Sequence, residues 1–131
     1  MKYMLTIAGP EIDWSDITPE QMRESMGRWD AYTAELRAAG AMVAGEGLQP
    51  SSTATTIRFA GDEPITVDGP FAETKEQIGG FYLIDVEDLD AALEWARKQP
   101  VREGGMVEVR PVMDYEAAGG SSEHTSEEVA S

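Results

Sequence analysis

The clearest pattern along the chain is a stripe of apolar positions that recurs at steps of three and four between residues 18 and 40. Its members are Met22, Met26, Trp29, Thr33 and Leu36. This spacing predicts an α-helix with one face packed on a core. Thr18, Pro19 and Gln21 predict its start, because together they satisfy or avoid the free amides of the first turn. Gly40 predicts its end.

A second, shorter helix is predicted before Pro100, which stops it. Asp88, or alternatively Asp85, supplies its cap. Its apolar positions are Leu89, Ala92, Leu93 and Ala96.

Six segments carry the apolar patterns of β-strands. They are residues 3–8, 41–48, 53–60, 64–67, 81–86 and 106–112. The third and fourth flank Gly61 as a hairpin. Pro64 has no amide proton, so the return strand is expected to begin at a sheet edge. With the hairpin counted as an insertion, the remaining order is β-α-β-β-α-β, which is the order of ferredoxin-like α+β folds.

The composition changes near residue 114. Residues 117–122 read Ala-Ala-Gly-Gly-Ser-Ser, and the last nine residues are small, polar and acidic. Too little apolar surface is present there to offset the entropy of ordering the chain. We therefore predict one folded domain over residues 1–113 and a flexible acidic tail over residues 114–131.

Charge and composition exclude several classes of function. The formal net charge of −15 repels phosphate backbones and anionic lipids, so neither nucleic acid nor membrane is expected as a partner. The chain has no cysteine, which excludes disulfides and thiolate chemistry. No segment resembles a signal peptide or a membrane span, so the expected location is cytoplasmic. No nucleotide-binding loop or metal-ligand cluster is present, so we expect no cofactor and no metal.

The predicted central strands are apolar on both faces. Their alternating residues are Tyr3, Leu5 and Ile7 against Met4 and Ala8, and Phe81 and Leu83 against Tyr82, Ile84 and Val86. Two helices cover only one face of such a sheet, so the other face needs a partner. The simplest partner is a second copy in a C2 homodimer. Two curved sheets packed in this way form a dimeric α/β barrel with an internal cavity that suits a small molecule.

The segment from Asp68 to Tyr82 resembles the signature of the YCII-related family in its DGPF branch. It reads Asp-Gly-Pro-Phe-Ala-Glu-Thr-Lys-Glu-Gln-Ile-Gly-Gly-Phe-Tyr, and the similarity extends over about residues 1–113. The resemblance implies a dimeric α/β barrel, with relatives among cofactor-independent enzymes and stress-linked domains. Some relatives are encoded beside sigma factors, which implies a regulatory setting. The namesake branch is associated with a His–Asp pair, whereas the single histidine here, His124, lies in the predicted tail.

Three carboxylates near this motif are candidate catalytic residues: Asp68, Glu73 and Glu76. Pro70 forces a turn in which Asp68 acts either as a turn cap or as a buried base or ligand acceptor. Glu73 and Glu76 share a face if residues 72–78 form a helical turn. Such a pair suits acid–base chemistry, and the alternative is a solvated charged turn.

Five further residues are candidates for ligand binding: Arg58, Lys75, Tyr82, Arg110 and Tyr3. The two arginines lie on predicted strands, where they can bind a carboxylate or enolate if they face the cavity. Their alternative is a cross-strand salt bridge to Glu46 or Glu108. The tyrosines are expected to line the pocket.

Three functions fit these features. The preferred one is a domain that binds a small organic ligand at the dimer interface, in a regulatory role, because no histidine is available for catalysis. The second is a cofactor-independent enzyme acting on a small organic acid or carbonyl compound, with Asp68 as base and an arginine stabilising the anion. The third is a purely structural dimer. The sequence leaves open whether the protein is an enzyme.

Overall fold

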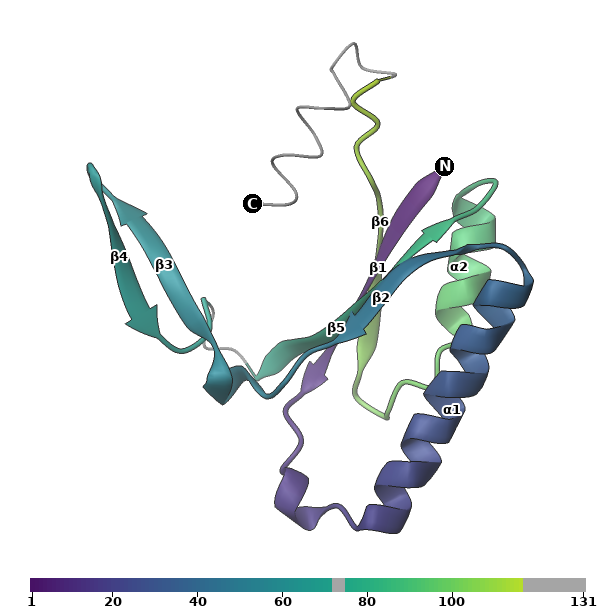
Figure 1. Cartoon of the computed structure of the whole chain (residues 1–131), viewed down its shortest axis with the longest axis horizontal. Coiled ribbons are helices and arrows are strands. Elements are labelled where there is room, and N and C mark those ends of the chain that lie inside the picture. The colour runs from purple at the N-terminus through teal and green to yellow at the C-terminus, as the bar shows by residue number, and fades with distance from the viewer. Residues whose placement is uncertain (72–74, 117–131) are drawn as a thin grey trace.

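The computed structural model describes residues 1–71 and 75–116. Its main layer is a four-stranded antiparallel sheet with the strand order β2-β5-β1-β6. These strands are β2 (Met42–Gly47), β5 (Glu76–Asp85), β1 (Lys2–Pro10) and β6 (Met106–Pro111). Helices α1 (Pro19–Ala38) and α2 (Leu89–Arg97) cover one face of the sheet (Figure 1). The central place of β1 was predicted, and the whole arrangement is consistent with a ferredoxin-like α+β fold.

Helix α1 begins as its sequence predicts. The Thr18 hydroxyl accepts from the Gln21 amide at 3.1 Å, and the Gln21 side chain accepts from the Thr18 amide at 3.0 Å. The predicted apolar stripe is wrong at one position, because Met26 is 56% exposed whereas Tyr32 is buried. The buried residues of α1 are Tyr32 and Leu36, and Met26 lies outside the face that they define.

The core lies between the sheet and the helices. Its largest fully buried side chains are Leu5, Leu36 and Ile84. Tyr32 stands at the centre of an aromatic cluster, with ring centroids 6.1 Å from Trp29, 5.2 Å from Tyr82 and 6.1 Å from Trp95. Its hydroxyl donates to the carbonyl oxygen of Trp95 at 2.9 Å. The cluster fastens both helices to the middle of the sheet.

Burial raises the pKa of Tyr32 to about 12, and this predicts a loss of stability at high pH. An unfolded tyrosine ionises near pH 10. Between pH 10 and 12 the unfolded chain has lost this proton while the folded chain keeps it, so the free energy of unfolding falls as pH rises. We expect urea unfolding at pH 9 and pH 11 to show a larger fall for wild type than for Tyr32→Phe. Equal falls in the two proteins would contradict this assignment.

Strands β3 (Thr55–Ala60) and β4 (Glu63–Asp68) form a separate two-stranded sheet. It is the predicted inserted hairpin, and we call it the arm. The arm projects from one end of the main sheet, on the side away from the helices (Figure 1). Apart from Thr56, every residue of its two strands is exposed. The arm therefore adds little to the core of the chain that carries it.

Strand β5 begins earlier than predicted. Glu76 opens it and pairs with Pro10 of β1. The expected helical turn over residues 72–78 is therefore wrong for residues 76–78, because pairing with β1 extends the chain there. Residues 72–74 and 117–131, which include Glu73, His124 and most of the predicted tail, lie outside the described residues. Within the described residues, no helix is both long enough and apolar enough to span a membrane.

Candidate functional site

The sheet face that carries no helix is the most extensive candidate surface, and we call it the open face. Tyr3, Leu5, Tyr82 and Ile84 are buried in the core, so the residues between them on β1 and β5 point the other way. Strand register places the following residues on the open face: Met4, Thr6, Ala8, Ala44, Glu46, Phe81, Leu83, Met106, Glu108 and Arg110. Strands from opposite ends of the chain thus contribute to one surface.

Apolar and charged residues separate across this face. Met4 and Leu83 are cross-strand neighbours at its centre. Glu46 lies on the edge strand β2, and Glu108 and Arg110 lie on the edge strand β6. An apolar centre inside a polar rim is the usual anatomy of a protein–protein interface.

Arg110 forms an ion pair on this rim. Its Nη2 atom lies 2.7 Å from Oε1 of Glu108, and both side chains are exposed. The partner is one of the two predicted alternatives, but it lies two residues along the same strand rather than across the sheet. The reason is alternation, which places both side chains on one face of β6.

The corner at Asp68–Phe71 lies at the root of the arm. Gly69 adopts a φ of 108°, a conformation that favours glycine. Its amide donates to the carbonyl of Ala54 at 2.8 Å, and its carbonyl accepts from the Thr56 hydroxyl at 2.6 Å. The Arg58 guanidinium donates to the carbonyl of Phe71 at 3.4 Å. The corner is therefore held against β3, while the Phe71 side chain is exposed.

Among the described candidates, Asp68 and Arg58 lie apart on the arm. Asp68 is opposite Thr55 across the arm, whereas Arg58 is opposite Ile65. These positions fall on opposite faces of the arm, so the structure does not bring Asp68 and Arg58 together. Lys75 and Glu76 are exposed at the start of β5. Among the described residues, no group of three or more potential ligands could hold a metal ion.

The two candidate tyrosines lie in the core instead of on the open face. The Tyr82 and Thr33 hydroxyls are hydrogen bonded at 2.7 Å, and the Tyr3 hydroxyl donates to Sδ of Met1 at 3.3 Å. Both rings are on the helix-covered side of the sheet, so they cannot line a cavity on the open face. Alternation correctly grouped Tyr3 with Leu5, but helix packing decides which group is covered.

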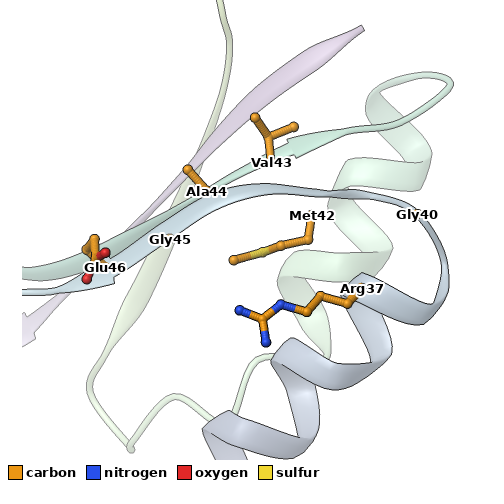
Figure 2. A pocket seen from close by; sticks show the side chains of 7 residues that line it. All are labelled: Arg37, Gly40, Met42, Val43, Ala44, Gly45 and Glu46. Atoms are coloured by element: carbon orange, nitrogen blue, oxygen red, sulfur yellow. The ribbon is translucent and has the colours of Figure 1, made fainter. Parts of the chain in front are cut away.

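A groove that the sequence does not predict runs along strand β2 (Figure 2). It encloses about 450 Å³, and we call it the β2 groove. Its lining residues are Arg37, Gly40, Met42, Val43, Ala44, Gly45 and Glu46. Figure 2 shows the Arg37 side chain extending from α1 below the strand, with Glu46 toward the far end of β2. The groove thus carries both signs of charge around an apolar strand.

The four-stranded sheet, with helices on one face and an open apolar face on the other, makes this chain a small α+β domain. The chain belongs to the YCII-related domain family, whose sequence profile matches residues 1–116. It is also similar to an uncharacterized protein of Rhizobium meliloti (strain 1021), with 50% identity over 70 residues. That match covers 52% of this chain and 56% of the relative, so the chain spans about half the length of the curated relative that it matches.

Proposed function

We propose that this YCII-related chain is a binding domain that works as a C2 homodimer and encloses a small organic ligand between two open faces. The observation that carries the proposal is the apolar centre of the open face, which neither helix covers. Apolar residues on both faces of a sheet favour burial of both faces. A second copy covers the open face with a surface that has the same apolar centre.

The charged residues at the edges of the open face favour a ligand that carries polar groups. Pockets for small molecules combine apolar walls with a few placed polar side chains. The centre of the open face supplies the walls, and Glu46 and Arg110 stand on its two edges. A small organic acid with an apolar body fits this combination, because its carboxylate can pair with an arginine.

We also propose that the chain belongs to the DGPF branch of its family. Asp68, Gly69, Pro70 and Phe71 form a corner whose glycine has a positive φ. This corner needs glycine because of the positive φ, and the proline that follows restricts the backbone of that glycine further. The motif composition therefore fits a turn at the root of the arm. Some relatives in this family are encoded beside sigma factors, and this supports a regulatory role for the proposed ligand binding.

Sedimentation velocity tests the homodimer. We expect wild type at 10 µM to sediment at twice the chain mass of 14.2 kDa. Leu83→Glu places a charge at the centre of the open face and should yield the monomer, because burying an unpaired carboxylate is costly. Leu89→Glu is the matched control, since Leu89 is exposed at the start of α2. A stable wild-type monomer would overturn the proposal.

Ligand binding is tested on the same proteins with benzoate, salicylate and pyruvate. A bound acid should raise the melting temperature of wild type, and the rise should be absent in Leu83→Glu. A dimer that no acid stabilises would favour the purely structural alternative. Consumption of a bound acid or carbonyl compound would favour the enzyme alternative with Asp68 as base.

A further inference from the structure

The arm is a separate two-stranded sheet that exposes apolar side chains on both of its faces. An isolated two-stranded hairpin is marginally stable at best in water. In the arm, Phe59 is 83% exposed and Ile57 is 55% exposed on one face, and Ile65 and Val67 are exposed on the other. The hydrogen bond from Gly69 to Ala54 ties it down only at its root. The arm therefore needs a surface to cover it.

One face of the arm carries charges of both signs. Register places Arg58 opposite Ile65, and Ala60 opposite Glu63. These four residues share a face with Thr56 and Val67. The other face holds Ile57 and Phe59 with Thr66 and Pro64, and its only charged residue is Asp68 at the root. We call the face with Arg58 and Glu63 the charged face.

The β2 groove, like the charged face of the arm, combines charges of both signs with apolar surface. Arg37 and Glu46 supply its charges, and among the described residues neither forms an ion pair. Met42 and Val43 supply apolar surface, and Val43 is exposed. Strand β2 is also an edge of the sheet, a position where natural proteins usually cover or block the strand.

We propose that the arm of one chain docks by its charged face into the β2 groove of a second copy. Arg58 then meets Glu46 of the second copy, Glu63 meets Arg37 of the second copy, and Ile65 packs on the apolar strand between them. This docking rests on the proposed homodimer and names the contact that holds it. Two such pairs of opposite charges also offset part of the repulsion between two chains of net charge −15.

The area of the open face favours such a second contact. Strands of six to ten residues, at about 3.4 Å per residue and about 4.8 Å apart, present a flat area of roughly 500 Å². Stable dimers bury roughly 800 Å² on each partner. The arm stands on the helix-free side of the sheet (Figure 1), which is the side that the proposed second copy covers. A two-fold axis then produces two identical arm–groove contacts and closes the assembly.

Disulfide trapping tests the docking. Because the chain has no cysteine of its own, only the introduced cysteines can form a disulfide. A tagged chain with Ile65→Cys is coexpressed with an untagged chain with Val43→Cys and oxidised with diamide. With equal expression, random pairing places about half of the tagged chain in mixed dimers, and we expect most of that half to run as a tagged–untagged covalent dimer. The matched control replaces Ile65→Cys by Phe59→Cys, which lies on the opposite face of the arm and should link only at background level.

Charge exchange supplies an independent test. Arg58→Glu and Glu46→Arg should each raise the dimer dissociation constant at least about tenfold, because each brings like charges together. The double variant should recover most of the loss. Additive losses, or equal trapping through Phe59 and Ile65, would overturn the docking while the homodimer stands. A monomeric wild type would overturn the homodimer and the docking with it.

Discussion

Replacing Ile84 with alanine is expected to lower the free energy of unfolding by about 3 kcal/mol. Ile84 is fully buried on β5, where Tyr3 of β1 and Met42 of β2 are its cross-strand neighbours. Strands β1 and β2 pair with β5 on its two sides and hold its backbone in place, so the cavity left by the side chain cannot fully collapse. The melting temperature should fall by roughly 10–20 °C. Urea unfolding at one fixed protein concentration measures the effect, because dimer formation makes stability depend on concentration.

Ile57→Ala is the matched control for this loss. It removes the same atoms from a β-strand, but Ile57 lies on the arm and is 55% exposed. Its effect should stay under about 1 kcal/mol. If the two variants lost equal stability, the assignment of β5 to the centre of the core would be wrong.

Local signals in the sequence predict the elements well. Thr18 and Gln21 cap α1 through bonds between residues three apart, so the neighbouring sequence suffices to locate the helix start. Asp88 caps α2 in the same local manner, with its carboxylate accepting from the amide of Ala91 at 2.9 Å. The hairpin was equally predictable, because Gly61 adopts the positive φ that its turn needs.

Long-range packing decides what the sequence could not. Alternation separates Tyr3 from Met4, but only the docked helices determine that Tyr3 is covered and Met4 is not. The same applies along α1, where Tyr32 is buried and Met26 is exposed. Glu76 became a strand residue because β1 continues to Pro10 and pairs with it.

The candidate site was predicted only in part. The open apolar face was expected from two-sided strands, whereas the β2 groove depends on how Arg37 of α1 lies beside β2. The strand is irregular between Met42 and Ala44, where its register with β5 shifts. No spacing rule reports such a shift. The faces of the hairpin also depend on its register, because the structure pairs Ala60 with Glu63 and thereby separates Asp68 from Arg58.

The two adjacent glycines of β5 are expected to respond very differently to alanine. A Cβ atom at Gly80 would lie 2.8 Å from the carbonyl oxygen of Glu46 and 3.2 Å from Cα of Gly47. Both are backbone atoms of β2, so the strand must shift as a whole. We expect Gly80→Ala to lower the free energy of unfolding by about 1–3 kcal/mol, the usual range for overpacking.

Gly79→Ala is a control one residue away on the same strand. A Cβ atom at Gly79 meets nothing within 4 Å, and its φ is not positive. Alanine there reduces the freedom of the unfolded chain, so stability should be unchanged or slightly higher. Amide hydrogen exchange adds a local measurement: in Gly80→Ala, exchange should accelerate along β2, the strand that lines the groove proposed to receive the arm. Unchanged β2 exchange and stability in Gly80→Ala would show that the two strands do not approach as closely as this register requires.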